Sequence, residues 1–262
     1  MKKVQSILAI LPLLILAIFS CNKPAGGDNN SIPYQLSYGD SIIYLRPVSG
    51  DYIVNPLTRR DGVYSGFPEG IELNSATGAI NVSKSETGLR YRITHTAPDG
   101  TVTTTTVVLS GITFKDKFYN LSQQDSMAMP VYNASEINIL PLNGSNFDDG
   151  NGANSGGCSV RTDNGKINLA QCVRNGVFGT IPQDDSRRDF EIAYRINDGS
   201  DKSLNKIKVR IYYYSSMATV ATDLLQTLSD RQSDGVFLRG ASSETVVQAA
   251  KPRPPCVIII AN

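Results

Sequence analysis

The stretch FEIAYRINDGSDKSLNKIKVRIYYY, residues 190–214, decides the fold class of this chain. Apolar and polar residues alternate with a period of two on both sides of a turn at Asn-Asp-Gly-Ser, residues 197–200. Successive side chains of a β-strand point to opposite faces, so this alternation predicts a hairpin with one buried and one wet face. The predicted buried layer contains Phe190, Ile192, Tyr194, Ile196, Ile207, Val209, Ile211 and Tyr213.

The same alternation occurs earlier, at residues 89–96, where Leu, Tyr, Ile and His share one face. A Pro-Asp-Gly turn at 98–100 leads into a second apolar segment, 102–112. Short β-branched and aromatic runs separated by Gly, Asn, Asp or Pro recur throughout, which predicts an all-β fold. Helical spacing occurs at 218–232, and the apolar run 256–260 predicts a terminal strand inside a sheet. The remaining strands predicted in the first half are 34–38, 41–48, 71–73 and 79–82.

One segment of the chain occurs twice. Residues 77–82, TGAINV, are echoed 87 positions later by residues 164–169, NGKINL. The Asp-Gly turn at 99–100 is echoed at 198–199, so the second copy carries extra residues between these landmarks. A repeated order of short strands and turns predicts two tandem domains of one kind.

Residues 67–80, FPEGIELNSATGAI, resemble the signature of Ig-like domains related to cadherin-type repeats. In that family a Pro-x-Gly turn precedes a short strand, an Asn-x-x-Thr-Gly turn and a second short strand. The resemblance extends over the first copy and, more loosely, the second, which lacks the Pro-x-Gly element. It implies two tandem Ig-like or cadherin-like β-sandwich domains. The first is expected at 33–114, a linker at 115–128, and the second, with a short C-terminal helix and strand, at 129–262. The first strand of the second domain is predicted at 129–132 or at 137–140.

Residues 1–20 have the layout of a secretory signal peptide. Two lysines precede an apolar run of about 13 residues, shorter than the roughly 20 that a membrane-spanning helix needs. Residues 18–21, Ile-Phe-Ser-Cys, resemble a bacterial lipobox, which implies a lipid on Cys21 that anchors the chain to the outer membrane, facing the periplasm or the cell surface. The polar residues 21–32 then form a tether. The alternative is a secreted protein in which Cys21 is an ordinary thiol.

The composition excludes several functional classes. With 25 basic and 24 acidic residues, the chain offers no general attraction for nucleic acid. Its single histidine excludes a site that needs two imidazoles from one chain, and it has no Gly-rich phosphate loop, Gly-x-Ser-x-Gly or Cys-x-x-Cys motif. The sequence predicts a non-enzymatic binding, adhesion or spacer module without catalytic residue, cofactor or metal, whose partner is a glycan or an envelope protein. The alternative is a structural subunit of an envelope assembly or glycan-uptake complex.

Two cysteines flank a predicted hairpin turn at residues 163–166. A three-residue loop would place Cys158 directly opposite Cys172, whereas a two-residue loop would turn them to opposite faces. We expect a disulfide between Cys158 and Cys172, which closes a loop worth roughly 3 kcal/mol of stability. Cys256, beside an aliphatic run, is expected to be a buried thiol.

The outward face of the strand at 205–214 is the candidate ligand surface. Tyrosine rings there can stack on a glycan, and the cations can pair with an anionic polymer. The other interpretation is an ordinary solvated strand face. The residues of this expected platform are Lys208, Arg210, Tyr212 and Tyr214.

Two further features have a functional and a structural interpretation. Residues 146–154, NFDDGNGAN, suggest a calcium loop, but Ala153 stands where an oxygen ligand is needed, so a flexible polar loop is preferred. His95 falls on the inward face near a strand end, where a hydrogen-bonded core histidine is the expectation.

Overall fold

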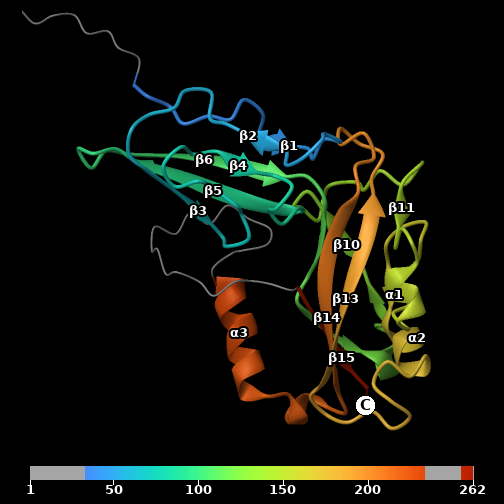
Figure 1. Cartoon of the computed structure of the whole chain (residues 1–262). Coiled ribbons are helices and arrows are strands. Elements are labelled where there is room, and N and C mark those ends of the chain that lie inside the picture. Colours follow the sequence, from blue (N-terminus) through green and yellow to red (C-terminus); the bar gives the residue numbers. More distant parts are fainter. Residues whose placement is uncertain (1–32, 234–254, 262) are drawn as a thin grey trace, which may run out of the picture. The chain divides into compact units, whose positions relative to one another are not determined.

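The computed structural model describes residues 33–233 and 255–261 (Figure 1). The predicted signal peptide, Cys21 and the tether lie outside the described residues. From Gln35 onward the described residues form one compact unit. Strands account for 34% of the structure and helices for 13%, which confirms the predicted all-β class.

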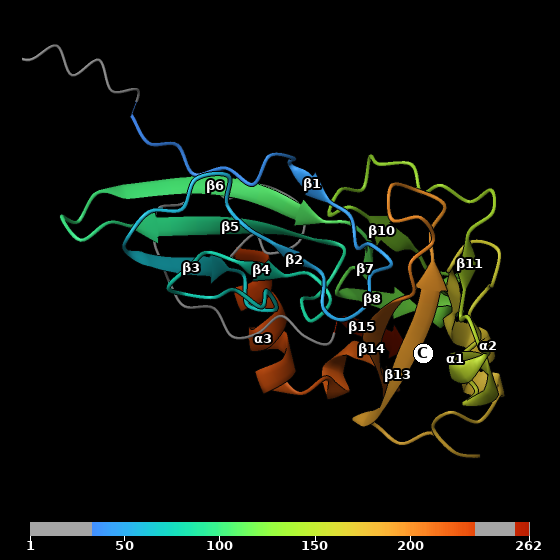
Figure 2. The ribbon, with the colours of Figure 1, turned by 45° about the horizontal axis from the view of Figure 1, so that its top comes forward.

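The first half of the described chain forms a four-stranded sheet with the order β1-β6-β5-β3 (Figure 2). Strand β5 pairs antiparallel with both β3 and β6, while β1 pairs parallel with β6. A separate small sheet joins β2 to β4. These strands are β1 (Ile42–Ile43), β2 (Ile53–Val54), β3 (Val63–Phe67), β4 (Ile80–Asn81), β5 (Leu89–Thr96) and β6 (Val102–Leu109).

The long predicted hairpin of this half is confirmed, whereas the shorter predicted strands are either shortened or absent. Strand β5 has the predicted bounds and buries alternate side chains, His95 among them. The strand expected at 102–112 divides into β6 and β7 (Ile112–Phe114), which belongs to another sheet. Residues 34–38 form no strand, and 41–48 keep only the two residues of β1.

The second half folds around a five-stranded sheet with the order β11-β13-β14-β15-β8. Strands β13 and β14 form the long antiparallel hairpin that the alternation predicts. The terminal strand β15 lies between β14 and β8, parallel to both, which confirms that it is inside a sheet. The strands are β8 (Lys117–Asn120), β11 (Asn146–Phe147), β13 (Ser186–Arg195), β14 (Asn205–Tyr214) and β15 (Cys256–Ile260).

Two small sheets complete this half. Strand β7 pairs with β10 (Pro130–Tyr132), and β9 (Met127–Ala128) pairs with β12 (Ile167–Asn168). Strand β10 thus coincides with one of the segments in which the second domain is expected to begin.

Residues 115–128, where a linker is predicted, contain regular secondary structure. The segment contains β8, the 3-10 helix η1 (Leu121–Gln123) and β9, and β8 is the edge strand of the second sheet. Its Tyr119 is buried, and the Asn120 side chain accepts the first N–H groups of η1. Because a short edge strand buries only some of its side chains, its composition resembles that of a linker.

Helices cover both faces of the second sheet (Figures 1 and 2). Helices α1 (Gly152–Ser155) and α2 (Leu169–Arg174) pack on one face, and α3 (Thr222–Ser233) packs on the other. A 3-10 helix, η2 (Met217–Thr219), precedes α3. The helix predicted at 218–232 is confirmed, but it begins at Thr222.

Strand β15 contributes to both apolar clusters of this half. Val257 and Ile259 pack into the large cluster that includes α1 and α2. Ile258 and Ile260 pack into the smaller cluster beneath α3. A strand that alternates between two buried faces reads as a continuous apolar run in the sequence.

The 87-residue repeat is present in the backbone pairing. A bridge joins Leu73 to Ile80, and an equivalent bridge joins Val160 to Ile167. Both members of the second pair lie 87 positions after those of the first. The sequence echo therefore marks two copies of one turn.

The two copies of the turn use glycine in the same way. Gly78 and Gly165 have φ angles of +72° and +70°, and the N–H of each donates to the carbonyl four residues earlier at 2.8 Å. A Cβ on Gly78 would lie 2.7 Å from the Tyr64 ring, and one on Gly165 would lie 2.8 Å from the Phe147 ring. Each turn thus needs glycine both for its backbone conformation and for an aromatic ring packed against it.

A buried polar contact joins the segment that holds the first copy of the turn (residues 63–112, here called the first repeat) to the segment that holds the second copy (residues 146–214, the second repeat). The hydroxyl of Tyr194, on β13, lies 2.8 Å from Thr87 Oγ1 and accepts the N–H of Ile112 at 3.2 Å. All three residues are buried. The two repeats therefore share a hydrogen-bonded contact as well as a chain connection.

Candidate functional site

A concavity of the second half, here called the β8–β10 groove, has a volume of about 630 Å³. Strands β8, β9 and β10 supply one part of its lining, and the loop 133–142 supplies another. The hairpin turn of the second repeat adds Asn164 and Lys166. The groove therefore combines an edge strand, a loop and a turn.

The loop 133–142 is fixed at its base. Asn133 and Ala134 are buried and have positive φ angles of 50° and 53°. The Asn133 side chain accepts the N–H of Gly111 at 3.0 Å, and the Asn138 side chain donates to the Tyr132 carbonyl at 3.3 Å. The ordered base presents the rest of the loop to solvent.

The exposed part of this loop carries aliphatic side chains among polar ones. Ile137 and Ile139 are each 89% exposed, and Leu142 is 47% exposed. Met129, at the start of β10, is 50% exposed. Residues 137–140, considered above as a strand, form none, so these side chains have no sheet to pack against. Clustered apolar side chains in solvent mark a contact surface.

Lysines lie beside these apolar side chains, and acidic residues compensate two of them. Lys115 forms an ion pair with Glu136, and Lys117 forms one with Asp125 at 2.8 Å. The Lys117 ammonium also lies 4.6 Å from the centre of the Tyr119 ring. The groove is therefore an apolar surface with mixed charges at its rim.

The tyrosines of the groove remain protonated. Burial, followed by the nearby Asp125 carboxylate, raises the pKa of Tyr119 to about 12. Burial, followed by the hydrogen bond that its hydroxyl donates to Asp198 at 2.7 Å, raises the pKa of Tyr132. Neither phenol can supply a base at neutral pH, so the groove is suited to binding.

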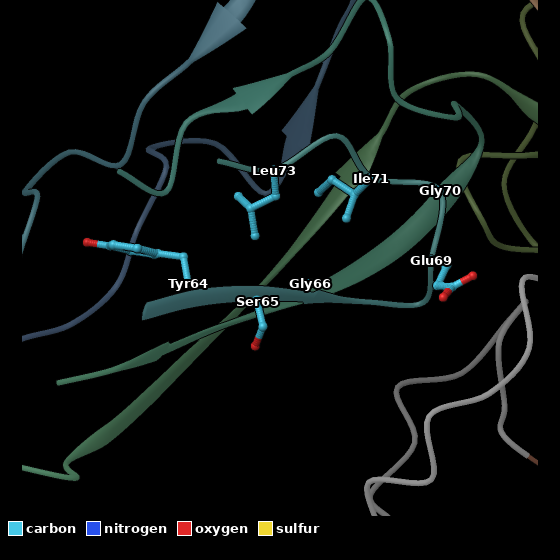
Figure 3. A pocket seen from close by; sticks show the side chains of 7 residues that line it. All are labelled: Tyr64, Ser65, Gly66, Glu69, Gly70, Ile71 and Leu73. Atoms are coloured by element: carbon cyan, nitrogen blue, oxygen red, sulfur yellow. The ribbon is translucent and has the colours of Figure 1, made fainter. Parts of the chain in front are cut away.

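A smaller pocket of about 250 Å³ lies beside β3 (Figure 3). Its lining includes two glycines and the aliphatic side chains of Ile71 and Leu73, and Glu69 supplies the carboxylate. The Tyr64 hydroxyl at this pocket exchanges hydrogen bonds with the backbone of Arg60, at 3.0 and 3.1 Å. One carboxylate without a partner acid or nucleophile in the lining does not form a catalytic pair.

The expected platform on β14 is not formed. Tyr212 is 6% exposed and Tyr214 is fully buried, because α3 packs over this face of the strand. The Tyr214 hydroxyl donates to Asp185 at 2.7 Å. The alternation correctly places both tyrosines on one face, but that face is part of the core.

The two cations of the expected platform are surface residues. Lys208 is exposed. Arg210 makes a bidentate ion pair with Asp189, its neighbour on β13, at 2.6 and 2.7 Å. This ion pair lowers the pKa of Asp189. Arg210 is thus engaged across the hairpin.

The expected disulfide is absent, although its two cysteines are close. Cys158 and Cys172 are buried free thiols whose side chains lie 4.1 Å apart. Cys172 reaches this position from α2 and accepts the N–H of Ser159 at 3.2 Å. The turn pairs Val160 with Ile167, so neither of the two loop lengths considered is the one observed. Cys256 is the first residue of β15, and the burial of its thiol stays a prediction.

The loop 146–154 is organised by a carboxylate that accepts N–H groups. Asp148 is buried, and its oxygens accept the backbone N–H groups of Ala153 and Asn154, each at 2.8 Å. The Asn154 side chain donates to the same carboxylate at 2.6 Å. These donors occupy the oxygens that a cation would need. Nowhere in residues 33–233 and 255–261 do three His, Cys, Asp or Glu side chains gather as a metal site would require.

His95 is a core histidine, as predicted. It is 1% exposed, its Nε2 lies 3.0 Å from the Asp61 carbonyl, and its ring centre lies 4.6 Å from that of Tyr64. It lies in the first sheet, whereas the β8–β10 groove belongs to the second half.

The sequence reasoning did not identify the groove. The available signal is the alternation of isoleucines and polar residues in the loop 133–142 next to a proline, a pattern that by itself predicts a strand. No protein-family model matches the chain, and a search of curated proteins finds no match. The geometry of the groove is therefore the basis for proposing a function.

Proposed function

We propose that this chain is a non-enzymatic binding module of the bacterial cell envelope, anchored at the outer membrane by a lipid on Cys21. Two tandem Ig-like, cadherin-like sandwiches form its body in this proposal. The repeated turn and the two multistranded sheets support the tandem arrangement, and the resemblance to a lipobox supports the anchor. No helix among the described residues has the length and apolarity needed to cross a membrane.

The observation that carries the binding role is the aliphatic rim of the β8–β10 groove. Met129, Ile139 and Leu142 expose apolar surface around a concavity of about 630 Å³. Burying such side chains stabilises a complex by roughly 25 cal/mol for each Å² removed from water. The rim thus provides a driving force for association.

The chemistry of the rim favours a protein segment over a glycan. Sugars are recognised by flat aromatic surfaces and fixed hydrogen-bond donors, whereas this rim is aliphatic and the chain contains no tryptophan. Lys115 and Lys117 with their acidic partners suit a partner that carries both charges. The proposed ligand is an apolar segment of another envelope protein.

Site-specific photo-crosslinking in intact bacteria tests this role. A photoreactive amino acid is placed at Ile139 and, as a matched control, at Ile181, which is 76% exposed but does not line the groove. We expect one discrete adduct from position 139, absent from position 181 and abolished by Leu142→Asp. Equal labelling from both positions contradicts the proposal. An adduct whose mass is twice that of the chain instead supports the structural-subunit alternative.

The anchor is tested separately by changing Cys21 to Ser. The unmodified chain is expected in the membrane fraction, and mass spectrometry of its N-terminal peptide should show a diacylglycerol thioether on Cys21. The variant is expected in the soluble fraction. Membrane association that survives the substitution, or an N-terminal peptide without lipid, contradicts the anchor.

A further inference from the structure

Strand β15 is the last strand of the described chain, yet it lies inside the second sheet and not at its edge. It lies between β14 and β8 and is parallel to both, with Tyr212 opposite Ile258 and Phe118 on its other side. The other strands of this sheet all come from residues 117–214. The chain reaches β15 from the end of α3 through residues 234–254, a stretch of 21 residues.

The first sheet shows the arrangement without an inserted strand. There β1, the first strand in the chain, pairs directly and in parallel with β6, with Ile42 opposite Val108. In the second sheet β8 comes before β14 in the same way, but β15 separates the two. The place beside β14 is therefore a slot that the end of the chain fills, here called the β14–β8 slot.

The contacts that hold β15 in this slot are made by its own side chains and backbone. Val257 and Ile259 are fully buried in one cluster, and Ile258 and Ile260 are at most 2% exposed in the other. Backbone pairing on both edges adds the ladder with β14 and β8. An identical strand from another molecule would make the same contacts.

We propose that β15 exchanges between copies of this chain, so that the C-terminal strand of each copy fills the β14–β8 slot of the other. The exchanged pair keeps every contact of the slot, and the difference is which copy of the chain supplies the strand. A connection of 21 residues spans at most about 75 Å when extended, which is enough to reach a neighbouring molecule. This inference goes beyond the proposed binding function and does not depend on it.

Concentration decides between the closed and the exchanged forms, because both make the same contacts in the slot. The strand of the same chain competes at an effective concentration in about the millimolar range for a short connection. Exchange therefore increases when the chain refolds at concentrations approaching that range. If β15 always pairs within its own chain, the fraction of dimer does not depend on the concentration at refolding.

The register of β15 supplies a covalent reporter of exchange. Arg210 lies opposite Cys256 in the parallel pairing, so Arg210→Cys places two cysteines at neighbouring positions. The full-length chain, also carrying Cys21→Ser, is unfolded, refolded under reducing conditions at about 10 µM and about 1 mM, and then oxidised. In the closed form the new disulfide lies within one chain, and in the exchanged form it links two chains.

We expect a covalent dimer whose fraction rises at least about tenfold between the two refolding concentrations. The lower concentration lies well below the effective concentration of the strand of the same chain, and the higher one is comparable to it. The matched control is Lys206→Cys, on the same strand but paired with Ala193 and not with β15, which should give no such rise. Adding Cys256→Ser to the Arg210→Cys variant should abolish the dimer. A covalent monomer at both concentrations, or equal dimer from the Lys206→Cys control, overturns the proposal.

A second measurement needs no substitution in the sheet. Two full-length chains with different affinity tags are refolded together at about 1 mM and then diluted to about 10 µM, below the effective concentration of the connection. Exchanged pairs separate only by pulling out β15, so one tag should still retain the other chain after dilution. Loss of co-retention within minutes of dilution contradicts strand exchange.

Discussion

Replacing Tyr194 by Phe removes one oxygen atom from the contact between the two repeats and leaves the ring in place. That oxygen lies 2.8 Å from Thr87 Oγ1 and accepts the N–H of Ile112 at 3.2 Å, in a region without solvent exposure. Leaving a buried donor without its partner costs about 1–3 kcal/mol. For a chain of this size, each kcal/mol shifts the midpoint of thermal unfolding by about 2–4 °C. The variant should therefore unfold about 2–12 °C earlier.

Thermal unfolding followed by circular dichroism measures this effect, and a second variant separates coupling from general stability. Tyr91→Phe removes a phenol that is equally buried but donates to Glu86 within the first repeat, at 2.9 Å. A double-mutant cycle of Tyr194→Phe with Thr87→Val should give a coupling free energy of about 0.5–3 kcal/mol. Tyr91→Phe combined with Thr87→Val should give a smaller coupling free energy, because the Tyr194 hydroxyl shares a hydrogen bond with Thr87 whereas the Tyr91 hydroxyl donates to Glu86.

The pH dependence provides an independent check on the same hydroxyl. Burial raises the pKa of Tyr194 to about 12, so the folded state holds this proton while the unfolded state releases it near pH 10. Its contribution to stability is complete below about pH 10 and is lost as the pH rises towards 12. Tyr194→Phe should therefore lose less stability over that interval than the unsubstituted chain.

Three outcomes would refute the account of this contact. One is a midpoint for Tyr194→Phe unchanged from that of the unsubstituted chain. Another is an additive double-mutant cycle with Thr87→Val. The last is an identical loss of stability between pH 10 and 12 with and without the phenol.

Three more substitutions test individual contacts. Arg231→Met should lower the free energy of unfolding in urea by about 3–5 kcal/mol, because it removes the ion-pair partner of Asp116. The two side chains are only 7% and 10% exposed. A loss below about 1 kcal/mol would contradict this expectation. Asp189→Asn should cost less than about 1 kcal/mol at pH 7, because the ion pair with Arg210 is half exposed. Since that ion pair lowers the pKa of Asp189, the stability that it contributes is present above about pH 4 and lost at lower pH. The stabilities of the unsubstituted chain and of Asp189→Asn should therefore become equal in acid, and a difference that persists there would refute the role of the ion pair. Gly165→Ala should cost about 1–3 kcal/mol for its positive φ alone, and a gain in stability would exclude strain at the turn.

The sequence predicts the long hairpins well because their signal is local. In Leu89–Thr96 the alternation of apolar and polar residues fixes both the strand and its inward face, and the structure has the same bounds. The repeat is equally visible because its turns need glycine at the same place, Gly78 in the first copy and Gly165 in the second. Both signals come from geometry over a few residues.

What covers a strand face is not a local property, and this accounts for the failed ligand platform. Alternation assigns Tyr212 and Tyr214 correctly to one face of β14. Whether that face is wet depends on α3, which contributes Leu224, and on β15, which contributes Ile258 and Ile260. A short polar strand such as β8 is missed for a related reason, because its partner lies about 140 positions further along the chain.

The β8 strand links the two proposals physically. Lys117 and Tyr119 line the groove, and the same strand pairs with β15, its neighbour in the second sheet. Because α1 and α2 cover one face of this sheet and α3 the other, a partner must use an edge or a loop, and the groove lies at the β8 edge. Strand exchange leaves β8 paired, so an exchanged dimer presents two intact grooves on one particle. Two linked grooves bind a partner with two matching segments more tightly than one groove does. Strand exchange would therefore increase the avidity of the groove for such a partner.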